Sequence, residues 1–268
     1  MSDGDVERDD EATENGSAAG DQSAREVPLV GGNVTPVSRR GGTVLRSAGP
    51  WTPSVQAVLA HARDTGLTRT PEPRGLSPDG RELVSYLPGT VPAYPMPAWV
   101  WRDSVLVQAA RMLRAWHDAT DGFSPDDAVW RLPCHEPFEV ICHNDFAQYN
   151  LVFDLDGGEP VLTGVIDFDT MSPGPRLWDI AYLAYRLVPY LDEPDAPEPH
   201  TRAARLALLL DAYGTAIAPS EVFAAMEAKL HELADFTQEL AAASGRSDLG
   251  RDAEMYRDHA ARITCDGA

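Results

Sequence analysis

The sequence predicts an α+β protein of two lobes, a small β-rich N-terminal lobe followed by a mostly helical C-terminal lobe. Short apolar and β-branched runs, separated by glycine and proline, fill residues 27–87. Beyond residue 98, apolar residues recur at helical spacing over long segments. A chain of 268 residues is long enough for one large domain or for two lobes with a cleft.

The chain is predicted to begin with a disordered acidic tail over residues 1–26, which hold nine acidic residues against Arg8 and Arg25. The N-terminal lobe is expected over residues 27–88. Its one helix is predicted over 53–65, where Thr52 can cap the first turn and Gly66 can end the last. Its strands are predicted at 27–30, 34–38, 43–47, 73–76 and 81–87.

The C-terminal lobe is expected over residues 89–268. A long helix over 99–120 should bury one face, and a helix over 177–188 should follow the break at Pro173-Gly174-Pro175. Three more helices are predicted at 202–213, 219–241 and 249–262. Between the first two helices, the apolar segments 138–142, 151–153 and 161–166 are predicted to be strands, the last two forming a hairpin.

Three oxygen-bearing side chains are placed together by these strands. Asp145 and Asn150 lie on the loop 143–150 between the first two strands, and Asp167 follows the third. Because the hairpin returns to the end where the loop lies, we expect the three side chains to converge. A carboxylate, a carboxamide and nucleotide phosphates would make an oxygen shell of the kind that Mg²⁺ prefers.

The spacing His-x-Asp-x-x-x-x-Asn with a later aspartate is typical of phosphoryl transfer to a hydroxyl. In this interpretation Asp145 accepts and orients the proton of the attacking hydroxyl, and His143 braces the loop. Asn150 and Asp167 are the predicted magnesium ligands. Each such residue by itself is more often an ordinary turn former, so the prediction rests on the set.

The chain resembles the aminoglycoside phosphotransferase and choline kinase-like family at three motifs, namely residues 143–150, Ile166-Asp167-Phe168-Asp169 and Trp178-Asp179-Ile180-Ala181. It is also similar at Trp116-His117-Asp118-Ala119-Thr120. The resemblance implies a two-lobed protein kinase-like fold with a shortened N-lobe. It implies Mg²⁺ as cofactor, ATP or GTP as phosphoryl donor, and a link from Asp179 to the catalytic loop. The role of Asp169 stays open.

The N-terminal lobe departs from the family pattern. The family's strand lysine is absent, since the one lysine of the chain is Lys229, and Arg46 lies where it would be. An arginine can grip phosphate, although an exposed strand arginine is an equal alternative. The helix also lacks the family's glutamate, and Gln56 is the nearest substitute. These departures leave two hypotheses, an active kinase with an unusual nucleotide grip or a catalytically silent pseudokinase.

The segment before Pro88-Gly89 resembles the family's hinge strand. The backbone groups of Ser85 to Leu87 would then contact adenine. An ordinary edge strand would show the same residues.

Charge and composition indicate which classes of partner the protein is expected to bind and in which compartment it is expected. The formal net charge is −20, which disfavours nucleic acid and favours a cationic small-molecule substrate such as an aminoglycoside, although solubility alone explains it too. No apolar run is long enough for a membrane span, and no export signal is visible, so we expect a cytoplasmic protein. The three cysteines show no disulfide framework and match no zinc spacing.

Overall fold

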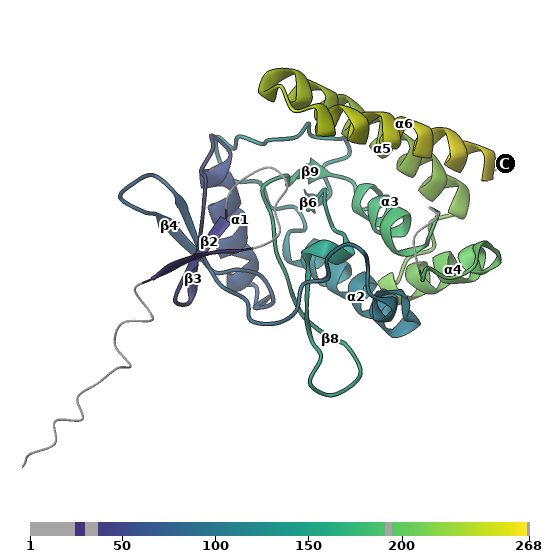
Figure 1. The fold of residues 1–268 in the computed structure, drawn as a ribbon, viewed down its shortest axis with the longest axis horizontal. Coiled ribbons are helices and arrows are strands. Elements are labelled where there is room, and N and C mark those ends of the chain that lie inside the picture. Colours follow the sequence, from purple (N-terminus) through teal and green to yellow (C-terminus); the bar gives the residue numbers. More distant parts are fainter. Residues whose placement is uncertain (1–24, 30–36, 191–194, 267–268) are drawn as a thin grey trace, which may run out of the picture.

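The computed structural model describes residues 25–29, 37–190 and 195–266. Figure 1 shows a small sheet with helix α1 beside it, on the side that faces the remaining helices. The predicted α+β class is confirmed, with a small antiparallel sheet followed by a mostly helical part. Most of the acidic tail lies outside these residues, and the predicted strands 27–30 and 34–38 lie partly outside them.

The N-terminal sheet has the strand order β1-β2-β3-β5-β4. Antiparallel pairing joins β2 to β3 and β3 to β5 in a continuous register. The pairing of β3 with β5 sets Arg46 opposite Glu82. The strands are β1 (Glu26–Pro28), β2 (Val37–Arg40), β3 (Thr43–Arg46), β4 (Pro73–Leu76) and β5 (Glu82–Ser85).

The predicted disordered tail ends too late in the sequence. Glu26 is part of β1, where it pairs with Arg40 and its carboxylate accepts hydrogen bonds from Ser38 and Arg81. Ion pairs and ladder hydrogen bonds hold the strand edge, and composition alone does not reveal such partners.

Helix α1 (Thr52–Asp64) covers the sheet with the predicted apolar face, where Val55, Val58 and Leu59 are fully buried. The predicted cap is wrong: Trp51 precedes the helix, and the Thr52 hydroxyl accepts the N–H of Gly49 instead. Proline in the first turn needs no amide partner, so the helix begins without a side-chain cap.

The C-terminal lobe begins with the 3₁₀ turn η1 (Ala98–Trp101) and helix α2 (Asp103–Ala119). The sequence predicted one helix over this span, but Arg102 is extended (φ −62°, ψ 143°) and divides it. Trp116 and Leu113 of α2 are fully buried in the core that α2 shares with helix α3 (Arg176–Leu187).

Short strands lie next to α2 and hold the catalytic-loop segment. Strand β6 (Val140–Cys142) pairs with β9 (Ser172–Gly174), which was not predicted, and the 3₁₀ turn η2 (Gln148–Asn150) closes the loop. The predicted hairpin is confirmed: β7 (Leu151–Asp154) and β8 (Val161–Val165) pair antiparallel. The loop 143–150 and the segment after β8 therefore lie at the same end of these strands.

The chain ends with the 3₁₀ turn η3 (Pro199–Thr201) and helices α4 (Arg202–Tyr213), α5 (Pro219–Ser244) and α6 (Ser247–Asp266). Helices α5 and α6 run side by side along the outer face of the lobe, and α5 packs on α3 (Figure 1). Within the described part of the chain, every helix is too short or too polar to cross a membrane.

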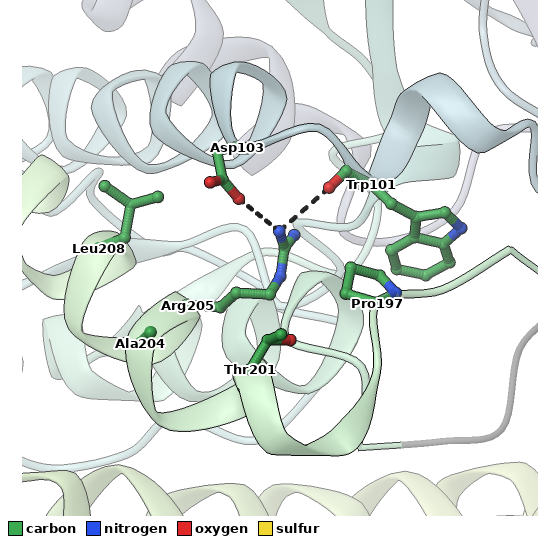
Figure 2. Close-up of a pocket in the computed structure, with 7 residues that line it drawn as sticks. All are labelled: Trp101, Asp103, Pro197, Thr201, Ala204, Arg205 and Leu208. Carbon is green, nitrogen blue, oxygen red and sulfur yellow. Dashed lines mark hydrogen bonds and ion pairs between the residues drawn. The ribbon is translucent and has the colours of Figure 1, made fainter.

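A small pocket of about 360 Å³ lies between the start of α2 and α4 (Figure 2). Arg205 spans it, donating to the carbonyl oxygens of Trp101 and Leu187 and to the carboxylate of Asp103. None of the predicted site residues lines this pocket. Its arginine therefore joins helices, and the candidate site lies elsewhere.

Candidate active site

The loop after β6 brings Asp145 and Asn150 together. The Asn150 amide nitrogen donates to the backbone oxygen and to Oδ2 of Asp145, both at 2.9 Å. The Tyr149 hydroxyl donates to Oδ1 of the same carboxylate at 2.7 Å. Both oxygens of Asp145 are thus directed by the loop, while the residue itself stays half-buried and accessible. The Asn150 side-chain oxygen takes no part in these two bonds.

The environment of Asp145 makes it a stronger base than an exposed aspartate. Burial raises the pKa of Asp145 above its ordinary value, the hydrogen bond from Tyr149 acts against this rise, and the charge of Asp167 adds to it. A higher pKa brings a carboxylate closer to the working range of a general base.

His143 braces the loop from within, as the sequence predicts. Its Nε2 lies 3.1 Å from the carbonyl oxygen of Ile166, and its Nδ1 accepts the backbone N–H of Asp145 at 3.3 Å. The ring is fully buried and packs 4.6 Å from the ring of Phe168. It therefore links the loop to the segment that carries Asp167 and does not reach solvent.

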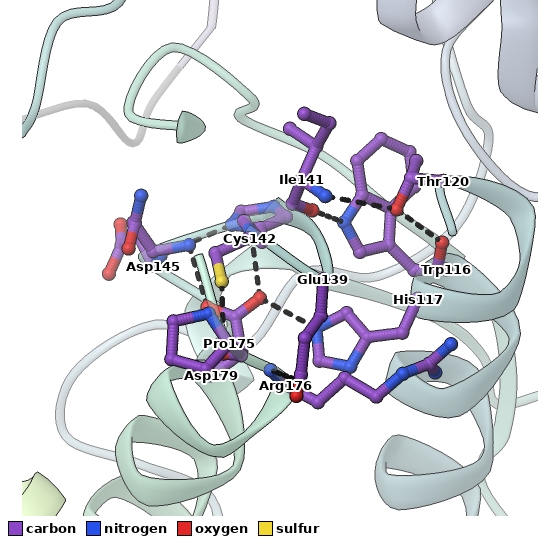
Figure 3. A network of polar contacts seen from close by, with 12 residues as sticks. Trp116, His117, Thr120, Glu139, Ile141, Cys142, Asp145, Pro175, Arg176 and Asp179 are labelled. Carbon is purple, nitrogen blue, oxygen red and sulfur yellow. Dashed lines mark hydrogen bonds and ion pairs between the residues drawn. The ribbon is translucent and has the colours of Figure 1, made fainter. Parts of the chain in front are cut away.

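Asp179 on α3 holds the backbone of the loop. Its carboxylate accepts the N–H of His143 at 2.6 Å, the N–H of Asn144 at 2.8 Å and a contact from His117 at 3.1 Å (Figure 3). Burial works against its ionisation, but the contact with His117 and nearby positive charges hold its pKa below the ordinary value. The link that the resemblance implied for Asp179 is therefore present.

Asp167 lies at the open edge of the site. Its backbone is left-handed (φ 67°) and its side chain is 51% exposed. One of its oxygens lies 3.2 Å from Nη1 of Arg46, which reaches across from the N-terminal lobe. The charge of Asp167 is close enough to raise the pKa of Asp145.

Arg46 is neither exposed nor held by the helix. Its Nε donates to Glu82 at 2.7 Å, and its Nη2 lies 2.8 Å from Asp169. Only 8% of the residue is exposed, so the alternative of an exposed strand arginine is wrong. The pairing of β3 with β5 directs both side chains to the same covered face.

Glu82 therefore has the position relative to Arg46 that a helix glutamate has in the family pattern. Gln56 of α1 completes the group by donating to the second oxygen of Glu82 at 2.6 Å, while its own oxygen accepts the N–H of Gly75. Strand β5 therefore supplies the carboxylate that helix α1 lacks.

Asp169, whose role the sequence left open, is an ion-pair partner of Arg46. Burial raises its pKa to about 6, although the charge of Arg46 acts in the opposite direction. Arg131 lies 3.8 Å from its other oxygen. Two arginines thus neutralise an otherwise costly buried carboxylate.

The predicted adenine-contacting segment is only partly free to bind. The N–H of Ser85 donates to Glu72 and that of Tyr86 to Gly42, and the Ser85 hydroxyl accepts from Glu72. Outside helices and strands, no backbone hydrogen bond of Leu87 occurs among the described residues. Leu87 is therefore the better candidate of the two.

A group of tyrosines and one arginine lies next to Asp145. Tyr149 also contacts the hydroxyl of Tyr182 at 2.8 Å, and Arg186 lies over the Tyr149 ring, 5.2 Å from its centroid. Arg186 donates to the hydroxyl of Tyr94, a residue that is 56% exposed. A buried positive charge therefore lies over the tyrosine that donates to Asp145.

Two oxygen ligands suit a magnesium ion here. Asp167 offers an exposed carboxylate, and Asn150 offers a carboxamide oxygen because its nitrogen is engaged with Asp145. Such a donor set fits Mg²⁺, which keeps several waters and binds phosphate oxygens.

A second group, His117, Cys142 and Asp179, is compact but unsuited to a metal. His117 and Asp179 contact each other and further polar groups, and the pKa of the Cys142 thiol is raised well above its ordinary value by burial. A buried neutral thiol is a poor ligand.

Comparison with known proteins agrees with this geometry. Residues 126–218 match the phosphotransferase enzyme family. The trifolitoxin immunity protein of Rhizobium leguminosarum bv. trifolii is 33% identical over 201 residues, which cover 70% of this chain and 74% of that protein. The chain belongs to the phosphotransferase enzyme family. Its structural neighbours include aminoglycoside phosphotransferases and choline or ethanolamine kinases.

Two solved structures show that this phosphotransferase shares the family fold. A choline/ethanolamine kinase family protein from Mesorhizobium loti has a TM-score of 0.58 and 20% identity, covering 92% of this chain and 89% of that one. A spectinomycin phosphotransferase in complex with ADP and spectinomycin has a TM-score of 0.58 and 10% identity, covering 89% and 92%.

Three residues of the phosphotransferase site were missed in the sequence. Glu82 had a signal, because two adjacent predicted strands can pair so that Arg46 faces it. Lys229, which donates to the side chain of Asn144 in the loop, had one too, since a lysine lies on the apolar face of a predicted helix. Arg186 had none, because only folding brings it to Tyr149 and Tyr94.

Proposed function

We propose that this protein is a small-molecule kinase that transfers the γ-phosphoryl group of ATP or GTP to a substrate hydroxyl. The observation that carries the proposal is the hydrogen bond from Asn150 to Asp145, with Asp167 close enough to raise the pKa of Asp145. Family membership agrees with this reaction class.

In this reaction Asp145 accepts a hydrogen bond from the acceptor hydroxyl and takes its proton late in the transfer. Tyr149 and Asn150 fix the rotation of the carboxylate, so that it is oriented before the acceptor binds. His143 keeps the loop attached to the segment that carries Asp167.

Asn150 and Asp167 would hold Mg²⁺, which when bound neutralises charge on the transferred phosphoryl group. Arg46, oriented by Glu82 and Gln56, would contact the phosphates from the N-terminal lobe. Backbone groups of Ser85 and Leu87 would border the base of the nucleotide, chiefly those of Leu87.

The acceptor is an aminoglycoside or another amino-bearing compound in this proposal. The net charge of −20 favours cations, and one structural neighbour is in complex with spectinomycin. The immunity-protein relative has a name that refers to a toxin, and phosphorylating a toxic compound is a protection that this site can supply. The positive charge of Arg186 requires that the acceptor's amino groups lie away from it.

A second candidate is a silent nucleotide- or ligand-binding pseudokinase. One observation favours it: Arg46 contacts Asp167 and Asp169, so a fixed guanidinium competes with a metal ion for the Asp167 carboxylate. In an active kinase, Mg²⁺ and nucleotide would draw Asp167 away from Arg46.

An assay with ATP or GTP, Mg²⁺ and a panel of hydroxyl compounds, in which the phosphorylated product is measured, separates the two candidates. We expect phosphate transfer that falls by at least about 100-fold in Asp145→Ala. Asp211→Ala, which removes an exposed carboxylate from α4, should match the parent. Nucleotide binding without transfer by the parent would support the silent protein instead.

The charge of the acceptor can be tested through Arg186. In Arg186→Gln, kcat/KM for amino-bearing acceptors should rise relative to uncharged ones, because a repelling charge close to Asp145 is removed. Arg257→Gln, which removes a charge from a surface ion pair with Asp235, should not change this ratio. A fall for amino-bearing acceptors alone would contradict the assignment.

A further inference from the structure

Lys229 is the one lysine of the chain and is fully buried on α5. Lysine is rarely buried, because its ammonium group loses hydration and its long side chain loses rotamer freedom. Its Nζ donates to the side-chain oxygen of Asn144 at 2.7 Å, 85 residues earlier in the chain. The bond joins the outer helical layer directly to the catalytic loop.

Asn144 stands between His143 and Asp145 in a left-handed conformation (φ 67°). Its side-chain nitrogen donates to the carbonyl oxygen of Thr170 and to the hydroxyl of Ser172, at 2.9 Å and 2.8 Å. With its oxygen bound to Lys229, the carboxamide is held on three sides. These bonds restrain the backbone that leads into Asp145.

Among the described residues, the ammonium group of Lys229 has aromatic rings around it and no direct ion pair. No carboxylate of the described residues accepts a hydrogen bond or ion pair from it, although Asp179 and Glu232 lie within electrostatic range. The rings of Trp178 and Tyr182 lie 5.1 Å and 5.7 Å from its Nζ. Asn144 is thus the direct hydrogen-bond partner of Lys229 among them.

We propose that Lys229 is a positioning residue for the phosphoryl transfer proposed above, and this inference rests on that function. By holding the Asn144 side chain, it keeps the left-handed backbone that aims Asp145 at the acceptor. An asparagine adopts this conformation more readily than most residues, but local bonds are needed to keep it there. Displacement of a catalytic group by about 1 Å can lower a rate about 100-fold.

The first experiment compares steady-state kinetics of Lys229→Met with the parent. We expect kcat to fall about 10- to 100-fold while the KM for nucleotide changes by less than about 3-fold, because the N-terminal lobe is untouched. Leu230→Ala is the matched control: it weakens packing of the same helix at a fully buried neighbour and should leave kcat per folded molecule at the parent value.

The second experiment tests whether the effect passes through Asn144. Asn144→Gly can adopt the left-handed backbone without support, so adding Lys229→Met to it should not lower kcat further. Lys229→Gln, which keeps a donor without the charge, should recover part of the activity. Independent, additive losses in the double variant would mean a merely structural lysine and would overturn the proposal.

The two proposals fail in different ways. If the parent transfers no phosphate, the kinase function fails and the positioning role fails with it. If the parent is active and Lys229→Met retains its kcat, only the role of Lys229 is lost.

Discussion

Arg46 is the residue on which the N-terminal side of the site depends. Three carboxylates surround it, and they raise its pKa above the ordinary value although burial acts against this. Lysine could not replace it, because Glu82, Asp167 and Asp169 are met by three separate nitrogens of the planar guanidinium, whereas the three donors of an ammonium group share one nitrogen. The arginine and the strand glutamate are best understood as one unit.

Removing the guanidinium should destabilise the fold. In Arg46→Gln, the buried carboxylates of Glu82 and Asp169 lose their cation, and we expect a loss of about 3–5 kcal/mol in the free energy of unfolding, measured with urea. Arg257→Gln at the surface should lose less than about 1 kcal/mol. Equal losses of stability in both variants would mean that the buried ion pairs of Arg46 contribute no more to stability than a surface ion pair.

Tyr149 should influence the pH at which kcat falls on the acid side of the pH profile. Asp145 must be ionised to act as a base, so activity is lost as pH falls through its pKa. Because the bond from Tyr149 lowers that pKa, Tyr149→Phe should move the acid limb of kcat to higher pH. Tyr185→Phe, whose hydroxyl contacts His259, should leave the limb in place. A pH profile of kcat at saturating substrate measures both.

At the scale of elements, α3 and the loop 143–150 act together. Asp179 is the junction, since its side chain accepts two backbone donors of the loop and contacts His117 of α2. Trp116 of α2 adds a bond from its indole nitrogen to the carbonyl oxygen of Ile141 on β6 (Figure 3). Two helices and a strand thus define where the loop begins.

Asp179→Asn should weaken this junction. An amide group cannot accept from both backbone donors, and we expect a loss of about 3 kcal/mol in the free energy of unfolding at neutral pH. Because the pKa of Asp179 is lowered in the folded state, its contribution is present above the pKa of the unfolded chain and disappears as pH falls through the folded value.

The parent and the Asp179→Asn variant should therefore converge in stability toward acid pH. Asp118→Asn, at a half-exposed ion pair on α2, is the control and should change stability by less than about 1 kcal/mol. A constant difference at all pH values would contradict the linkage.

At the scale of the molecule, the two lobes share one apolar core, in which α1 packs with α2 and α3, and polar and aromatic contacts add to it. Besides the ion pairs of Arg46, the N–H of Val129 donates to the Ser54 hydroxyl and the N–H of Val165 donates to Arg69. The rings of His61 and Phe123 stack at 3.8 Å. A nucleotide bound to both lobes would add to these contacts, and its effect should be visible in the stability of the whole protein.

Nucleotide with Mg²⁺ should raise the midpoint of thermal unfolding more than nucleotide alone. At a concentration 100 times the dissociation constant, the expected stabilisation is about 2.7 kcal/mol. Asn150→Ala should lose the part that depends on Mg²⁺ while keeping a response to nucleotide. The same shift with and without Mg²⁺ in the parent would contradict the assignment of Asn150 and Asp167 as ligands.

The parts of the site that are local in the chain could be predicted. Asp145 and Asn150 are five residues apart on one loop, and short apolar runs suffice to predict the strands on either side. The hairpin that follows has a turn with glycine, so Asp167 is carried back to the loop by short-range geometry alone. The helices have a strong apolar period, and their ends were predicted to within a few residues.

Contacts between distant segments were decided by the tertiary structure. Glu82 in place of a helix glutamate depends on strand register, and Asp169 as a partner of Arg46 depends on the approach of the lobes. Lys229 reaches Asn144 only because α5 packs on α3. The sequence by itself determined which chemical groups the loop carries. Packing alone decided which buried charges hold them, since desolvated charges must find partners that no local pattern encodes.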